Sequence, residues 1–153
     1  MDLIFKQYYM KKVAFTIVIL ISNYFFSQKI ISQEIYEGTL NDKPITLYLK
    51  ISESGCPNIY AEAIYKYKSN DNNNWLLLDV VFSEKNNLFT LVEHYNTGIL
   101  LLNKETFNFN GIWIAPDGKK QLKVELKKVK SNLKTLKNLE EKLEKENYEA
   151  NDC

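Results

Sequence analysis

The sequence predicts an all-β protein, an antiparallel up-and-down barrel of about eight strands followed by a C-terminal amphipathic helix. Three observations support this prediction. Residues 107–126 form two alternating apolar–polar segments around Pro116-Asp117-Gly118, three residues that suit a tight turn. Similar segments recur roughly every 10–13 residues from Glu34 onward, which is typical of a barrel or sandwich. At Lys130 the composition changes to mostly Lys, Glu, Leu and Asn, which favours a helix.

The candidate strands follow one another with polar turns between them. Residues 45–51 have the clearest pattern, because Ile45, Leu47 and Leu49 alternate with less apolar side chains. No helical pattern lies between the segments, so parallel crossover units are not expected. The expected strands are residues 35–40, 45–51, 58–68, 75–82, 88–95 and 99–102, with the two strands of the hairpin at 107–126. We expect one barrel domain over residues 33–129.

The segment 130–149 is expected to contain the helix. Leu133, Leu136 and Leu143 recur with helical phasing, and Leu139 lies beside them, which gives one apolar stripe on a charged helix. Three arrangements are open: the stripe packs on the barrel or caps it, it forms a two-heptad coiled coil between two copies, or the segment is a loosely ordered tail. Residues 150–153 are a short tail.

Residues 1–27 have the layout of a secretory signal peptide. Lys11 and Lys12 precede an apolar run that begins at Val13, and Ser27 is a small residue at the expected cleavage site. The run is shorter than the roughly 20 residues that a spanning helix needs, which favours cleavage over an uncleaved anchor. The protein is therefore expected to be exported to the periplasm, the cell surface or the medium, with the export signal as its one contact with the membrane.

The charge balance disfavours a nucleic-acid partner. The chain has 20 basic and 19 acidic side chains, and all of the basic ones are Lys. Removal of residues 1–27 takes away three Lys and one Asp, which leaves 17 basic and 18 acidic side chains and a net charge of −1. Nucleic-acid sites depend on Arg and on a basic excess, and the mature chain has neither.

Cys56 and Cys153 are the only cysteines. In an oxidising compartment two thiols tend to pair, which predicts a disulfide between the loop after the second strand and the chain end. The alternative is that Cys153 stays free or links two copies.

Few residues in this sequence are candidates for chemistry. His94 is the only histidine, and it cannot bind a metal without further ligands. Adjacent residues of a strand point to opposite faces, so His94 and Glu93 are not expected to share a site. Glu62, Asp79 and Glu93 lie in apolar strands, and inward carboxylates facing each other would suit glycoside hydrolysis. The more ordinary expectation is outward, solvated carboxylates, so we expect no enzyme activity, no metal and no cofactor.

Aromatic residues give the strongest indication of a pocket. Tyrosine is abundant, and it combines an apolar ring with a polar hydroxyl that suits ligand recognition. If the barrel encloses a cavity, the period-two phasing predicts that its lining includes Tyr65, Trp75, Phe109 and Trp113. The alternative is an interior filled with side chains, as in other barrels of this size.

Several segments resemble small secreted calycin-like barrels, of the lipocalin or avidin architecture, found among exported proteins of Bacteroidetes-type bacteria. The similar segments are Tyr36-Glu37-Gly38-Thr39-Leu40, the strand at 43–49, Leu91-Val92-Glu93, Gly111-Ile112-Trp113 and Asp117-Gly118-Lys119-Lys120. The resemblance covers residues 33–129 and implies a fold, but it transfers no ligand and no catalytic residue.

The sequence thus predicts an exported, non-enzymatic module that binds a small apolar or partly polar ligand. A protein-interaction or inhibitor module with a filled barrel is the alternative, and a hydrolase with inward carboxylates is a third hypothesis. The protein is expected to be a monomer or a dimer joined through the helix.

Overall fold

The computed structural model describes residues 29–54, 58–69 and 74–152. The predicted signal segment 1–27 and both cysteines, Cys56 and Cys153, lie outside these residues, so the predicted disulfide does too. The elements, in chain order, are β1 (Lys29–Leu40), β2 (Lys43–Ser54), β3 (Asn58–Tyr67), β4 (Leu76–Ser83), the 3-10 turn η1 (Glu84–Asn86), β5 (Leu88–Glu93), β6 (Ile99–Lys104), β7 (Asn108–Ile114), β8 (Gln121–Val129) and α2 (Leu133–Asn151).

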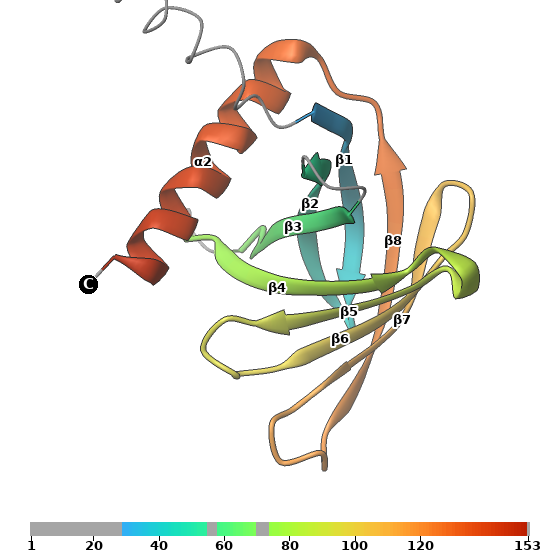
Figure 1. Cartoon of the computed structure of the whole chain (residues 1–153). Coiled ribbons are helices and arrows are strands. Elements are labelled where there is room, and N and C mark those ends of the chain that lie inside the picture. The colour runs from blue at the N-terminus through green and yellow to red at the C-terminus, as the bar shows by residue number, and fades with distance from the viewer. Residues whose placement is uncertain (1–28, 55–57, 70–73, 153) are drawn as a thin grey trace, which may run out of the picture.

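Each strand pairs antiparallel with the next one, and β1 pairs with β8 to close the barrel (Figure 1). The closing pair runs from Ile35 opposite Val129 to Leu40 opposite Val124. The predicted antiparallel barrel of eight strands with a C-terminal helix is therefore confirmed.

Most strand bounds differ by some residues from the prediction, and the differences at β1 and β5 have identifiable structural causes. β1 begins at Lys29 rather than at Ile35, and an irregularity between Ile30 and Ser32 shifts its register against β2. This irregularity interrupts the alternation of side chains, which hides the first part of the strand from a period-two reading. β5 ends at Glu93 because the chain turns there, with Asn96 at a φ of 54° and its N–H donating to the carbonyl of Glu93.

The barrel interior is packed with side chains. Along each strand alternate residues point inward. Tyr36 and Phe89 both pack against Phe109 in the interior, in tilted and edge-on arrangements with ring centroids 4.6 Å and 5.1 Å apart. The carbonyl oxygen of Leu101 approaches Gly111 so closely that a Cβ there would collide with it. The buried interior residues are Tyr36, Leu40, Ile45, Leu47, Leu49, Ala61, Ala63, Tyr65, Leu78, Phe89, Leu91, Leu100, Leu102, Phe109, Val124 and Leu126.

α2 packs on the outside of the barrel. Asn132 caps its start, since the Asn132 Oδ1 accepts from the N–H of Thr135 at 2.9 Å. Leu143 is the anchor, with 1% of its surface exposed, and Leu136, Leu139 and Ala150 pack beside it. Leu133, which belongs to the predicted apolar stripe, is 86% exposed, because it lies before the point where the helix reaches the barrel. Among the described helices, none has the length and apolar character needed to cross a membrane.

Candidate functional site

The outer wall of the barrel beneath α2 is organised in rows of paired residues. One row crosses four strands, with Ile35 opposite Tyr48, Tyr48 opposite Ile64 and Ile64 opposite Leu77. These four side chains form a second hydrophobic cluster with Leu143. α2 therefore lies along this row, and the two neighbouring rows flank the helix on either side.

Polar contacts fasten one flank of the helix to the barrel. Lys50 is nearly buried, and its Nζ lies 3.0 Å from Glu140 Oε1 and 3.9 Å from Glu62 Oε2. Asn147 donates to Glu62 Oε1 at 3.1 Å, and Gln33 donates to Glu140 Oε2 at 3.2 Å. Burial alone would lower the pKa of Lys50, but the hydrogen bond and charge of Glu140 outweigh it, so the pKa of Lys50 is raised.

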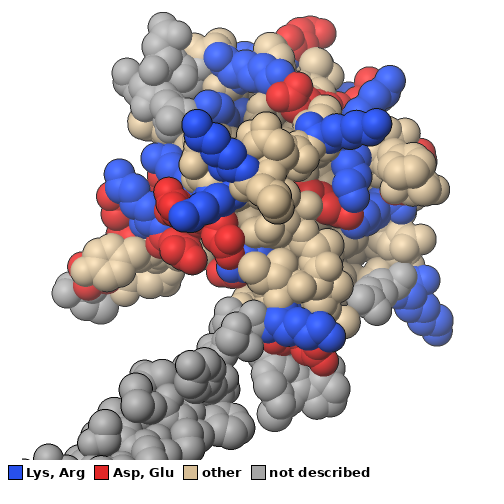
Figure 2. All heavy atoms as spheres, turned by 90° about the horizontal axis from the view of Figure 1, so that it is seen from above, with Lys and Arg blue, Asp and Glu red and all other residues tan. Residues whose placement is uncertain are grey.

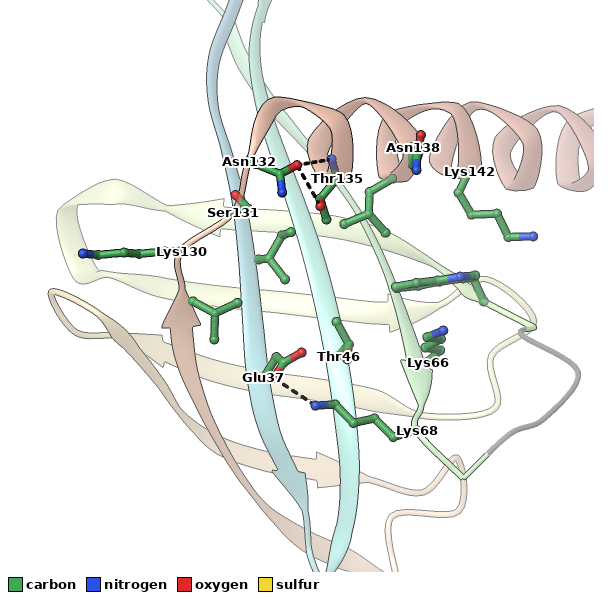
Figure 3. Close-up of a pocket in the computed structure, with 14 residues that line it drawn as sticks. Glu37, Thr46, Lys66, Lys68, Lys130, Ser131, Asn132, Thr135, Asn138 and Lys142 are labelled. Atoms are coloured by element: carbon green, nitrogen blue, oxygen red, sulfur yellow. Dashed lines mark hydrogen bonds and ion pairs between the residues drawn. The ribbon is translucent and has the colours of Figure 1, made fainter.

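A groove opens along the other flank. It has a volume of about 740 Å³ and lies between α2 and the outer faces of β1, β2 and β3 (Figure 3). Small-molecule sites in proteins commonly have volumes of about 300–1,000 Å³. Its lining residues are Ile35, Glu37, Thr46, Lys66, Lys68, Trp75, Val129, Lys130, Ser131, Asn132, Thr135, Asn138, Leu139 and Lys142. The groove therefore has the size of a ligand site, and it lies outside the barrel.

The apolar side chains of the groove come from both the barrel and the helix. Ile35 and Trp75 are buried on the barrel side, while Val129 and Leu139 pack against the same cluster. Trp75 precedes β4, and the Nζ of Lys66 lies 5.0 Å from the centre of its ring. These side chains form an apolar floor, and the ammonium group of Lys66 lies above the ring of Trp75.

Positive charge is concentrated at the rim of this groove. Four lysines and one glutamate line it, and Lys68 forms an ion pair with that glutamate, Glu37, at 2.9 Å. Lys142 pairs with Glu146 on the helix at 3.2 Å, and Lys130 extends away from the other lining residues in Figure 3. The first turn of α2 carries no acid to offset the positive end of its dipole.

On the face seen in Figure 2, lysine and acidic side chains lie side by side around a central uncharged area. Basic side chains on that face are therefore interspersed with acidic ones and do not form a broad basic surface.

The four predicted ligand-binding residues do not line one cavity. Tyr65 and Phe109 are buried inside the barrel. Trp113 lies at one end of the interior, whereas Trp75 lies outside, under α2. The structure brings Tyr65 and Trp113 together, because both donate hydrogen bonds to Glu93 Oε1, at 2.5 Å and 2.8 Å.

Glu93 is the carboxylate at that end of the interior, and it is 5% exposed. Thr97 donates to its other oxygen, and no described lysine or histidine forms an ion pair with it. Burial and the hydrogen bond to Glu93 raise the pKa of Tyr65. The arrangement holds the carboxylate with three neutral donors.

A second inward carboxylate, Glu34, lies toward the opposite end of the barrel. Its two oxygens contact Lys104 Nζ at 2.7 Å and Lys128 Nζ at 2.6 Å, and Tyr36 donates to it at 2.5 Å. Burial acts to raise the pKa of Glu34, but these hydrogen bonds outweigh burial and lower it to about 2. Glu34 and Glu93 thus belong to separate clusters at the two ends.

The remaining candidates for chemistry lie on the outer face. Glu62 and Asp79 face each other across β3 and β4, and Asp79 Oδ2 lies 3.5 Å from His94 Nδ1. His94 and Glu93 lie on different sides of the wall, as their adjacent positions predict. Within the described residues, no group of three or more His, Cys, Asp and Glu side chains could hold a metal ion.

Sequence reasoning missed the groove because its lining comes from segments far apart in the chain. The only local signal is the alternation of Lys66, in β3, and Lys68, just after its end, which favours the outer face for both lysines. No protein-family model matches this chain, and comparisons with curated proteins and with solved structures likewise gave no match.

Proposed function

We propose that this protein is an exported, non-enzymatic binding module that holds a small, partly apolar anion in the groove between α2 and the barrel. The observation that carries the proposal is the groove itself, about 740 Å³ in volume, with an apolar floor at Trp75 and lysines at its rim. An apolar pocket with a few placed polar groups is typical of small-molecule sites.

The chemistry of the lining indicates the kind of ligand. Trp75, Ile35 and Leu139 offer apolar contact to a hydrocarbon or aromatic body. The ammonium groups of Lys66 and of Lys68, which also pairs with Glu37, suit a carboxylate, sulfate or phosphate head, without the fork geometry that Arg would give. Because exposed lysines act as screened point charges, binding should weaken as salt rises.

The barrel interior offers less support for a ligand site. Its middle is filled by Tyr36, Phe89 and Phe109, and both ends carry a hydrogen-bonded glutamate. Membership among secreted calycin-like barrels remains part of the proposal, supported by the eight-stranded closed sheet and by the sequence segments that resemble those proteins.

The test compares an amphiphilic anion with its neutral analogue. Octanoate is titrated into the protein and followed by tryptophan fluorescence and calorimetry, with 1-octanol as the neutral ligand. We expect octanoate to bind more tightly, and the Trp75→Phe variant, which keeps Trp113, to lose the fluorescence change. Lys66→Gln should weaken octanoate binding several-fold, as expected for the loss of about 1 kcal/mol at a half-buried charge.

Lys119→Gln is the matched control, since Lys119 is an exposed lysine in the β7–β8 turn, away from the groove. Equal affinity for octanoate and 1-octanol, or equal loss in the Lys66 and Lys119 variants, would refute the proposal.

A protein-interaction module remains the second candidate. The filled interior favours it, and so does the apolar outer wall on the other side of the barrel from α2.

A further inference from the structure

The two ends of the groove between α2 and the barrel differ in charge. The groove follows one row of outer residues, in which Glu37 on β1 pairs with Thr46 on β2 and Thr46 pairs with Lys66 on β3. Neighbouring strands lie about 4.8 Å apart, so Glu37 and Lys66 are separated by about 10 Å along the groove. A ligand that lies along this row therefore has Glu37 at one end and Lys66, with Trp75, at the other.

The end of the groove at Trp75 suits an anionic group. Lys66 and Lys142 lie at this end in Figure 3, one on the barrel wall and one on α2. Lys142 also pairs with Glu146 at 3.2 Å, and the Nζ of Lys66 lies 5.0 Å from the centre of the Trp75 ring. A carboxylate beside Lys66 would therefore place its first carbon atoms against an apolar ring.

The opposite end of the groove carries a negative charge. Glu37 is the one acid among the described residues that line the groove, and its Oε2 lies 2.9 Å from Lys68 Nζ. In Figure 3 this ion pair crosses β2 and faces α2 from the other side of the groove. Both side chains are 43% exposed, so the charge of Glu37 remains partly accessible to a ligand.

The start of α2 lies at this same end, and it is already capped. Asn132 Oδ1 accepts from the N–H of Thr135 at 2.9 Å and from the Thr135 hydroxyl at 3.1 Å. The cap uses a backbone donor that an anion could otherwise take at the start of a helix. Lys130 extends away from the other lining residues in Figure 3. A carboxylate at this end would therefore lie beside Glu37 and share Lys68 with it.

We propose that the groove selects linear monocarboxylates over dicarboxylates of the same length, and that Glu37 is the residue that rejects the second carboxylate. This inference rests on the proposed function, because it requires an anion in the groove. The carboxylate binds beside Lys66, and the hydrocarbon chain runs over Thr46 toward Ile35 and Val129. With C–C bonds of about 1.5 Å, an extended eight-carbon chain spans about 9 Å, so a carboxylate at its far end would reach Glu37. Like charges at that contact repel each other, and water and salt moderate the repulsion.

Calorimetric titration at low salt with octanoate and with suberate, the eight-carbon dicarboxylate, tests this proposal. The pH is set so that both carboxyl groups of suberate are ionised, and the quantity compared is the ratio of the suberate Kd to the octanoate Kd. Glu37→Gln should lower this ratio about fivefold, because it removes the repulsion and releases Lys68 to the second carboxylate. Lys68→Gln should raise the ratio, because it leaves the charge of Glu37 without its partner. Glu125→Gln is the matched control and should leave the ratio unchanged, since Glu125 forms an exposed pair with Lys123, also of 2.9 Å, outside the groove.

The opposite shifts expected for Glu37→Gln and Lys68→Gln separate charge recognition from a structural role. Each variant breaks the same ion pair, so a purely structural effect would move the ratio in the same direction in both. Circular dichroism verifies that each variant folds. If octanoate binds but the ratio is unchanged in Glu37→Gln, or shifts with the same sign in both variants, this inference is overturned and the proposed function stands. Absence of octanoate binding to the unaltered protein would overturn both.

Discussion

Lys50 on β2 and Glu140 on α2 form an ion pair of 3.0 Å that joins the barrel wall to the helix. The pair lies on one flank of α2, whereas the groove lies on the other, between Leu139 and Trp75. The position of the groove therefore depends on how the helix is docked. Contacts that fix α2 should affect binding even when they do not touch a ligand.

Removal of one partner of this pair should destabilise the protein. Glu140→Ala leaves the nearly buried Lys50 with only the more distant Glu62, and we expect a loss of about 1–3 kcal/mol. Lys50→Met combined with Glu140→Ala should recover part of this loss, because the nearly buried ammonium group of Lys50 is then no longer left without its nearest partner. Urea unfolding of the two single variants and the double variant measures the coupling. Purely additive losses would contradict a direct interaction.

Loss of the hydrophobic anchor of α2 should destabilise the protein more than loss of the Lys50–Glu140 pair. Leu143 is almost fully buried, so Leu143→Ala should cost about 2–5 kcal/mol and weaken ligand binding, since the groove loses its helical wall. Leu133→Ala changes an exposed leucine of the same helix and should cost less than about 0.5 kcal/mol. Chemical unfolding and octanoate titration of both variants test this pair, and similar losses in the two would argue against a docked α2.

Low pH should lower the stability of the folded protein through protonation of Glu34. Its pKa is about 2 in the folded protein, against an ordinary 4.5, so the folded state binds this proton less readily than the unfolded state. The stabilisation is complete above pH 4.5 and is lost as the pH falls toward 2, with a total of at most about 3 kcal/mol. Screening at the partly exposed Lys128 reduces that total.

Urea unfolding at a series of pH values across this range measures the effect. Glu34→Gln should flatten the acid limb of the stability profile, whereas Glu125→Gln, on the outer face of β8, should preserve it. An unchanged acid limb in Glu34→Gln would show that the stabilisation comes from elsewhere.

The hydrogen bonds to Glu93, at the other end of the barrel, lead to a separate prediction. Tyr65→Phe removes one of three donors to the buried Glu93 and should cost about 1–3 kcal/mol, because a buried carboxylate loses a hydrogen bond. Tyr95→Phe alters a 75% exposed tyrosine and should have little effect. Thermal unfolding compares the stability of the two variants. An unchanged stability in Tyr65→Phe would mean that a water molecule replaces the phenol hydroxyl as a donor to Glu93.

The sequence predicted the barrel because its signal is local. Alternation in segments such as Ile45, Leu47 and Leu49, together with the turn at Asp117-Gly118, sets strand positions without knowledge of the rest of the chain. The structure places Gly118 at a φ of 70°, as that turn requires.

The face of the barrel wall on which Trp75 lies could not be predicted from such a local pattern. Residues 75–82 are almost continuously apolar, since the inner positions of β4 pack in the barrel while Leu77 packs under α2. Because both faces of the strand are largely apolar, the sequence does not show which residues face the barrel interior. Trp75 was therefore predicted to share a cavity with Tyr65. The face that a surface helix covers is a tertiary property, so the groove and its lysines had no local signature.

Mapping of the ligand on the folded protein tests the central claim most directly. Amide chemical shifts of isotope-labelled protein are recorded during an octanoate titration, with 1-octanol as the neutral reference. The account predicts saturable shifts at Lys66, Trp75 and Asn138, which come from three separate segments and meet only in the groove. Shifts confined to Tyr65, Phe109 and Trp113, or no saturable shifts at all, would contradict it.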